Sequence, residues 1–213
     1  YLQEDKILFT CDFFGSHLAT TDLYATDEAR VYEAAKRYYA EIMMPFRQII
    51  AKNLEKIKDY EIAVIAPSHG PIYDRPAFII DAYHDWVSSP PKNLVVIPYV
   101  SMHGSTGKMV AHLVNALAER GVRVEQFNLE ATDIGKLAAA LVDAATIVVG
   151  TPAILGGPHP YAISAAYLAN ALKPKVRFAS IIGSYAWGSR TIEQLAEVIS
   201  TLKVEILEPV FRK

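Results

Sequence analysis

The sequence of 213 residues predicts an α/β protein in which a doubly wound parallel sheet follows a smaller mixed unit. Two observations predict this class. From residue 93 to residue 207, short apolar segments alternate with helical segments, which is typical of parallel strands covered by helices on both faces. Before them, residues 88–93 read Ser-Ser-Pro-Pro-Lys-Asn, and a proline pair favours an extended connector. We therefore expect two domains, residues 1–89 and residues 90–213.

The first domain is expected to contain two short strands and two helical segments. They are predicted at residues 6–10, 27–59, 61–65 and 76–87. Pro76 suits the start of the last helix, because a first-turn N–H has no partner within the helix anyway. Pro45 lies inside the long helical segment, where the missing N–H and the proline ring disrupt the preceding turn. We expect that helix to kink or divide at Pro45.

The second domain alternates strand and helix throughout. Strands are predicted at residues 93–97, 122–129, 145–150, 176–183 and 204–207, and helices at residues 107–120, 134–143, 161–172 and 191–202. Gly121 follows the first of these helices, where a glycine stop is common. Pro98 cannot donate to a sheet ladder, so we expect the first strand to end or bulge there.

Composition and charge narrow the function classes. The chain carries 21 Lys and Arg against 23 Asp and Glu, which gives no electrostatic reason to expect nucleic acid or an anionic membrane as a partner. No apolar run approaches the roughly 20 residues of a membrane span. Cys11 is the single cysteine, so an internal disulfide is impossible and a reducing, cytoplasmic location is expected. The chain starts at Tyr1 and enters a strand-like segment at once, which we interpret as a piece of a longer protein.

The most informative segment is the loop Ser101-Met102-His103-Gly104-Ser105-Thr106-Gly107-Lys108, between the first strand and the first helix of the second domain. Its hydroxyls can donate to phosphate oxygens, its glycines allow close backbone approach, and the following helix offers unpaired N–H groups. The glycine spacing matches neither a GxxxxGK[ST] nucleotide loop nor a GxGxxG fingerprint. A Ser/Thr-capped helix with a glycine turn would give the same pattern, so the loop alone leaves both interpretations open.

Two further loops are expected at the same edge of the sheet, where ligands of open α/β sheets bind. Residues 150–160 read Gly-Thr-Pro-Ala-Ile-Leu-Gly-Gly-Pro-His-Pro and offer backbone amides and apolar tips. Residues 183–189 read Gly-Ser-Tyr-Ala-Trp-Gly-Ser. Tyr185 and Trp187 either wall a flat aromatic ligand or simply cap the core. A planar, phosphorylated cofactor would fit all three loops.

Through these loops, residues 94–207 resemble the flavodoxin-type FMN domain of flavodiiron proteins (A-type flavoproteins). The matching segments are SMHGSTGKM at 101–109, GTPAILGGPHP at 150–160 and GSYAWGS at 183–189. The resemblance implies a flavodoxin-like five-stranded parallel sheet of order 2-1-3-4-5, with the FMN phosphate in the first loop and the isoalloxazine ring between the other two. The residues that it implies for FMN are Ser101, Met102, His103, Gly104, Ser105, Thr106, Gly107, Thr151, Pro152, Ala153, Ile154, Leu155, Gly156, Ser184, Tyr185, Ala186, Trp187 and Gly188.

The chain departs from this family pattern at three places. Ala153 and Leu155 stand where Thr and Asn are common in the family, so the side-chain hydrogen bonds to the ring are lost there. A final helix, which a flavodoxin domain adds after its last strand, is missing beyond residue 207. Backbone contacts to the ring are still expected.

In the first domain, Asp12 and His69 each follow a predicted strand. A carboxylate and an imidazole at strand ends suit a metal ion, although such residues are more often caps or turn formers. Residues 7–87 resemble the C-terminal part of the metallo-β-lactamase-like αβ/βα domain of flavodiiron proteins, which implies Asp12 as the bridging aspartate and His69 as the last histidine ligand. The family's HxExDH motif is not found in the chain. A complete di-iron centre is therefore not expected from these residues alone.

The resemblance implies an oxidoreductase that reduces dioxygen to water or nitric oxide to nitrous oxide, with FMN relaying electrons to a non-haem di-iron site. It also implies a donor such as rubredoxin or a reduced deazaflavin, and a head-to-tail homodimer. Two alternatives remain. The chain is either an FMN electron-transfer module without a working metal site, or a metallohydrolase of the β-lactamase fold. Tightly bound flavin would exclude the metallohydrolase.

Overall fold

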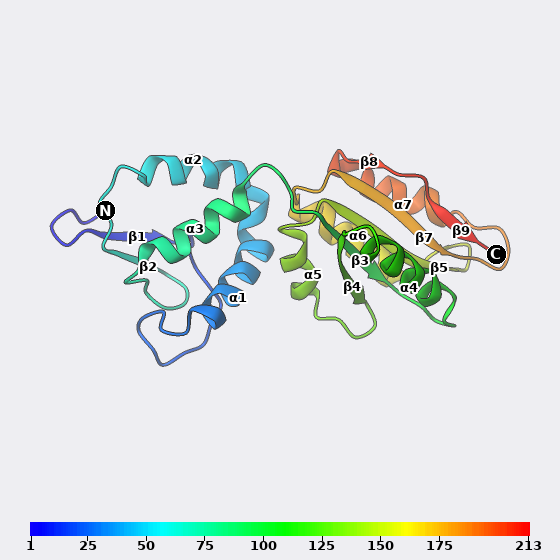
Figure 1. Cartoon of the computed structure of the whole chain (residues 1–213), viewed down its shortest axis with the longest axis horizontal. Coiled ribbons are helices and arrows are strands. Elements are labelled where there is room, and N and C mark those ends of the chain that lie inside the picture. Colours follow the sequence, from blue (N-terminus) through cyan, green and yellow to red (C-terminus); the bar gives the residue numbers. More distant parts are fainter. The chain divides into compact units, whose positions relative to one another are not determined.

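The computed structural model describes all 213 residues, and they divide into two compact units, Tyr1–Ser89 and Pro90–Lys213 (Figure 1). The first unit combines a short parallel pair of strands with three α-helices, and the second is an α/β sheet structure. None of the helices combines the length and the apolar character needed to cross a membrane.

The first unit is built around two parallel strands, β1 (Ile7–Cys11) and β2 (Val64–Pro67). The sequence pattern placed the second strand at residues 61–65, three residues too early. The backbone of Lys6 accepts from the N–H groups of Ala63 and Val64, so pairing begins only there. Glu61 instead points to solvent, where its carboxylate lies 2.6 Å from the Lys6 ammonium. The segment before Ala63 therefore lies outside the ladder.

Pro45 divides the long helical region, as predicted. Helix α1 (Glu28–Tyr38) is capped by Asp27, whose carboxylate accepts from the Arg30 N–H, and α2 spans Arg47–Ile57. Between them lie a π-helical turn, Tyr39–Met43, and a 3₁₀ turn, Met44–Phe46. The proline lacks the N–H that a regular α-helix would use at this point, so the ladder changes its spacing here. Helix α3 spans Pro76–Val87.

An aromatic core holds the first unit together. Tyr39, Tyr83 and Trp86 are completely buried, with neighbouring ring centroids 5.0 to 5.3 Å apart. Phe14 joins them, because its ring lies 4.8 Å from that of Tyr83 in an edge-on arrangement. Such pairs favour tilted or edge-to-face geometry, which this cluster adopts. The core therefore fixes α1, its π-helical extension and α3 to the loop that follows β1.

The second unit confirms the predicted alternation of strand and helix. Its elements are β3 (Leu94–Tyr99), α4 (Ser105–Ala118), β4 (Arg123–Asn128), α5 (Ile134–Leu141), β5 (Thr146–Ile154), β6 (Gly157–Pro158), α6 (Pro160–Leu172), β7 (Phe178–Ser184), α7 (Thr191–Ile199), β8 (Glu205–Ile206) and β9 (Val210–Arg212). The sheet runs β4-β3-β5-β7-β8 with parallel pairing, which is the order 2-1-3-4-5.

The sheet is buried on both faces. Val95 and Ile97 of β3 pack with Val110 of α4, and Val96, which lies between them in sequence, points to the opposite face and is also completely buried. Helix α6 packs against both α5 and α7. This arrangement explains why the central strands β3, β5 and β7 are mostly apolar, whereas the edge strand β4 carries exposed polar residues.

Three details differ from the sequence-based expectation. Strand β3 continues through Pro98 to Tyr99, and it pairs with β4 along its whole length. Its pairing with β5 skips Ile97 and Pro98, so the proline interrupts that ladder without ending the strand. Helix α4 begins at Ser105, two residues earlier than expected. The fifth sheet position is shared by β8 and the unpredicted β9, both parallel to β7.

Strand β5 is also longer than predicted, because it continues into a hairpin with β6. Ala153 pairs with Pro158 and Ile154 with Gly157, which leaves a loop of two residues. Leu155 and Gly156 in that loop both have positive φ, 49° and 84°. Two positive φ values are the requirement of a type I′ turn, and leucine is an uncommon residue for its first position. The hairpin was therefore not predicted from the residues at its turn.

Candidate functional site

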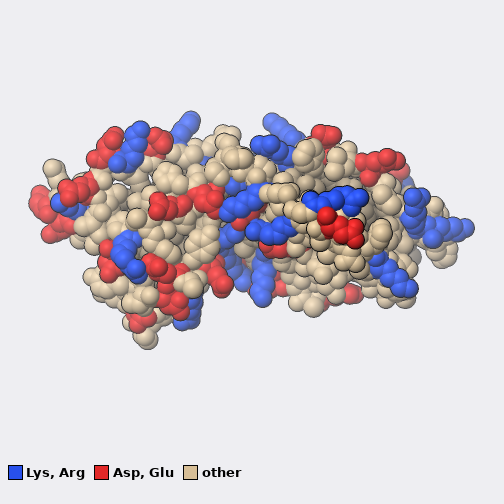
Figure 2. Space-filling view, viewed as in Figure 1, with Lys and Arg blue, Asp and Glu red and all other residues tan.

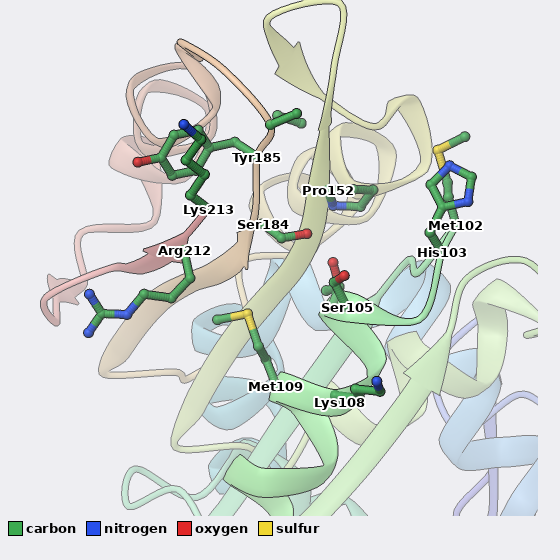
Figure 3. Close-up of a pocket in the computed structure, with 13 residues that line it drawn as sticks. Met102, His103, Ser105, Lys108, Met109, Pro152, Ser184, Tyr185, Arg212 and Lys213 are labelled. Carbon is green, nitrogen blue, oxygen red and sulfur yellow. The ribbon is translucent and has the colours of Figure 1, made fainter.

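The three loops singled out in the sequence lie at one edge of the sheet. Tyr99 at the end of β3 pairs with Gly150 of β5, and Pro152 pairs with Ser184 of β7. A pocket of about 430 Å³ opens beyond these strand ends. It is lined by Met102, His103, Ser105, Thr106, Lys108, Met109, Pro152, Ala153, Ser184, Tyr185, Ala186, Arg212 and Lys213 (Figure 3). This volume lies within the range of roughly 300–1,000 Å³ that small-molecule sites occupy.

The first loop presents unused hydrogen-bond donors to the pocket. Gly104 takes the left-handed conformation, with φ of 85°, and turns the chain into α4. The backbone N–H groups of Ser105 and Thr106 have no acceptor in the chain. The Thr106 hydroxyl is buried and also lacks a partner. Two free N–H groups and a buried hydroxyl at a helix N-terminus form an arrangement suited to an anion.

Ser101 has a different task from the one that its hydroxyl suggested. Its Oγ accepts a hydrogen bond from the Gly107 N–H at 2.9 Å and does not line the pocket. Gly107 itself is close to this side chain, because a Cβ there would lie 3.2 Å from the serine oxygen. Ser101 therefore caps the first turn of α4 from the preceding loop.

Basic side chains line the pocket and acidic ones do not. Lys108, Arg212 and Lys213 contribute to the lining, and no Asp or Glu does. Figure 2 shows Lys and Arg side chains gathered at the end of the second unit that carries the C-terminus in Figure 1. The charge of the lining therefore favours an anionic ligand.

The second and third loops supply the remaining walls. Figure 3 shows the hydroxyls of Ser105 and Ser184 directed into the same space beside Pro152, with the Tyr185 ring on the side of β9. Thr151 is completely buried, and its hydroxyl donates to the Pro152 carbonyl at 2.9 Å and accepts from the His159 N–H at 3.0 Å. It therefore shapes the loop and has no free hydrogen for a ligand.

The structure brings together half of the residues implied for FMN. Met102, His103, Ser105, Thr106, Pro152, Ala153, Ser184, Tyr185 and Ala186 line the pocket. It does not place there Ser101, Gly104, Gly107, Thr151, Ile154, Leu155, Gly156, Trp187 or Gly188. Leu155 is fully exposed at the tip of the hairpin, and Trp187 is 78% exposed.

Sequence reasoning missed Lys108, Met109, Arg212 and Lys213. A signal existed for the first two, because they follow Ser105 by three and four residues and so lie on the same helix face. No local signal pointed to Arg212, which reaches the pocket only because β9 pairs with β7.

These observations fit FMN. A phosphate needs N–H and O–H donors with positive charge nearby, and the unpartnered Thr106 hydroxyl, the free N–H groups and the basic lining supply them. The pocket continues from there to Pro152 and Tyr185, which can contact a flat ring.

The residues of the first unit do not fit a complete di-iron centre. The Nε2 atom of His69 lies 3.2 Å from Oδ1 of Asp12, with both side chains about half exposed. Cys11 Sγ is 3.9 Å from the same carboxylate oxygen, and the His17 ring lies 5.7 Å from that of His69. No group of three or more His, Cys, Asp or Glu side chains is placed to hold a metal ion. Asp12 and His69 are neighbours, as two ligands would be, but two ligands do not complete a metal site.

The fold and the pocket together define a two-unit α/β protein whose second unit is flavodoxin-like. Comparisons with known proteins agree. The family described as "ODP family beta lactamase" matches residues 1–70. A nitric oxide reductase of Moorella thermoacetica is 33% identical over 212 residues, covering 97% of this chain and 53% of the relative. A coenzyme F420H2 oxidase of Methanothermobacter marburgensis is 32% identical over 165 residues, covering 75% of this chain and 41% of the relative.

Among solved structures, rubredoxin oxygen:oxidoreductase from Desulfovibrio gigas superposes with a TM-score of 0.92 at 26% identity, covering 99% of this chain and 54% of that one. The flavodiiron protein from Giardia intestinalis gives 0.91 at the same identity. The chain belongs to the flavodiiron protein family. It spans about half the length of the curated relatives that it matches.

Proposed function

We propose that the chain is the FMN-containing part of a flavodiiron oxidoreductase that reduces dioxygen, nitric oxide or both. The observation that carries this proposal is the unpartnered, buried Thr106 hydroxyl, which lies beside two free backbone N–H groups in a pocket with a basic lining. Bound FMN would supply the one- and two-electron redox chemistry that amino acids lack.

In this proposal each group of the pocket has one task. The N–H groups of Ser105 and Thr106 and both hydroxyls would hold the phosphate, and Lys108 would add positive charge. Ala153 and Ser184 offer backbone and hydroxyl groups to the rest of the cofactor. The side chains that line the pocket would hold the flavin ring in place and keep water from part of the ring's surface.

The partners of the whole protein are part of the same proposal. The names of two relatives mention rubredoxin and coenzyme F420H2, so a small redox protein or a reduced deazaflavin is the expected donor. We further propose a head-to-tail homodimer in a reducing cytoplasm, in which the FMN of one subunit lies near the metal site of the other. Asp12 and His69 would then be two of the iron ligands.

The experiment that tests the FMN site is a binding titration of the purified chain with FMN and, separately, with riboflavin, which lacks the phosphate. We expect FMN to bind at least about a hundredfold more tightly, because several charge-assisted hydrogen bonds are each worth roughly 1.5–3 kcal/mol. Equal affinity for the two flavins would remove the phosphate site. If neither FMN nor riboflavin binds, the proposed function is overturned.

A second candidate function is an FMN electron-transfer module without a working metal site. In this chain Asp12 and His69 lie 3.2 Å apart, and no third metal-binding side chain is placed with them. The two candidates differ in iron content. We expect the chain itself to retain less than one iron per molecule after loading with Fe(II) and gel filtration. In a protein extended to the full length of its relatives, Asp12→Ala should abolish tight iron loading if the first proposal holds, and should change nothing if the second does.

A further inference from the structure

The last strand, β9, is built against one wall of the pocket. Its three residues pair with the end of β7 in parallel register, Val210 with Ile182, Phe211 with Gly183 and Arg212 with Ser184. The N–H of Tyr185 donates to the Arg212 carbonyl at 3.0 Å, so the pairing continues into the third loop. The backbone on which Tyr185 stands is therefore fixed by β9.

Gly183 leaves room for the ring of its partner. A Cβ at Gly183 would lie 2.5 Å from Cε2 of Phe211 and would also collide with the Thr151 carbonyl. The aromatic ring of Phe211 thus covers the bare backbone of the glycine, a cross-strand arrangement that stabilises glycines near sheet edges. Any side chain at position 183 would displace this ring.

The ring of Phe211 also supports Tyr185. Residues 183 and 185 point to the same side of β7 and its extension, and a diagonal cross-strand neighbour is within reach of an aromatic side chain. The two rings are nearly parallel, with 14° between their planes and 5.9 Å between their centroids. Tyr185 lines the pocket and Phe211 does not.

We propose that Phe211 is a positioning residue for the flavin pocket: it holds the Tyr185 ring at the β9 wall and so sets the space that a flat ring can occupy opposite Pro152. This inference rests on the proposed function, because it assumes that the ligand is FMN. Figure 3 shows the Tyr185 ring turned toward β9 and away from Pro152, which is the orientation that stacking on Phe211 would keep. Without the supporting ring, Tyr185 would be free to enter the pocket.

The test is a double-mutant cycle on the full chain, read out by the FMN dissociation constant and by the midpoint potential of the bound flavin. Phe211→Leu should raise the FMN dissociation constant about three- to tenfold, the effect expected from losing one aromatic stacking partner. In a Tyr185→Ala background, the same change at Phe211 should have no further effect on either quantity, because Phe211 acts through Tyr185.

Two variants serve as controls. Phe211→Tyr keeps the ring and should retain the wild-type affinity and potential. Val210→Ala removes a half-exposed side chain from the same strand and should also leave FMN binding unchanged. If Val210→Ala also weakens FMN binding, the effect of Phe211→Leu would reflect general damage to β9, and the role of Phe211 would be overturned.

The outcomes separate this inference from the proposed function. A wild-type chain that does not bind FMN removes the proposed function itself. If the wild-type chain binds FMN, two results overturn the role of Phe211 alone. Either Phe211→Leu has no effect, or it has the same effect with and without Tyr185. If Phe211→Leu does not fold, Tyr185→Ala alone can still overturn the inference, because unchanged affinity and potential in that variant would show that Tyr185 forms no wall of the site.

Discussion

The Ser101 hydroxyl accepts a hydrogen bond from the Gly107 N–H, with 2.9 Å between oxygen and nitrogen, and this contact joins the end of β3 to the first turn of α4. It makes one residue of the loop at residues 101–108 structural. The neighbouring Ser105 is exposed and lines the pocket. Two serines four residues apart in one loop thus have separate tasks.

The first prediction follows from this division. Ser101→Ala should lower the free energy of unfolding by about 1 kcal/mol, the usual effect of losing a capping hydroxyl. Ser105→Ala should leave the free energy of unfolding unchanged and weaken FMN binding. Chemical denaturation and flavin titration of both variants check this. Equal loss of stability in the two variants would show that Ser105 also supports the loop.

The second prediction concerns the buried hydroxyl of Thr106, which has no partner in the chain. An unsatisfied buried hydroxyl costs free energy, so Thr106→Val should leave the FMN-free protein as stable as the wild type or make it more stable by up to about 1 kcal/mol. The same change should raise the FMN dissociation constant at least about tenfold, since a charge-assisted hydrogen bond is lost. A variant that is at least as stable as the wild type but binds FMN more weakly is the result expected when the lost hydroxyl binds the ligand. A loss of stability with unchanged affinity would contradict the assignment.

The third prediction tests the basic lining of the pocket. Lys108→Met and Arg212→Met should each weaken FMN binding, and the loss should shrink as ionic strength rises, because salt screens the attraction between cation and phosphate. Titrations at low and at high salt provide the measurement. Lys173→Met is the matched control: this lysine is exposed at the end of α6 and does not line the pocket. An equally large loss of FMN affinity in Lys173→Met would show that only the net charge of the protein matters.

The fourth prediction is a pH dependence of the first unit. Burial raises the pKa of Tyr39 above the ordinary value near 10, and the positive charge of Arg47 opposes this only in part. The unfolded chain therefore loses the Tyr39 proton at a lower pH than the folded protein does. The resulting stabilisation is complete below about pH 10 and is lost as the pH rises toward the raised pKa of the folded state.

The variant that tests this dependence is Tyr39→Phe, because the Tyr39 hydroxyl is buried without a partner and its removal leaves no acceptor unpaired. Free energies of unfolding measured between pH 8 and pH 11 should fall less steeply above pH 10 in the variant than in the wild type. Identical slopes would show that Tyr39 does not govern the alkaline loss of stability.

Much of the fold could be predicted because its signals are local. These signals are apolar runs of strand length, the helical spacing of apolar residues, the helix break at Pro45 and the helix stop at Gly121. Each depends only on neighbours within a few residues, and the structure contains nearly all of the elements that they predict. The loop that lines one wall of the pocket also had a local signal, since Gly104, Ser105 and Thr106 are adjacent in the chain. The resemblance to flavodiiron proteins depended on three such loops.

The sequence by itself determined that strands and helices alternate, where the chain divides, and which loops lie at strand ends. Only the tertiary structure decided which of those loop residues reach the pocket. It turned Ser101 toward a backbone N–H, left Trp187 exposed, and brought Phe211 and Arg212 beside Tyr185 through pairing between β7 and β9. The physical reason is that the side chains opposite one another in a sheet are set by strand register between segments distant in sequence, and a three-residue strand such as β9 is too short to carry a pattern of its own.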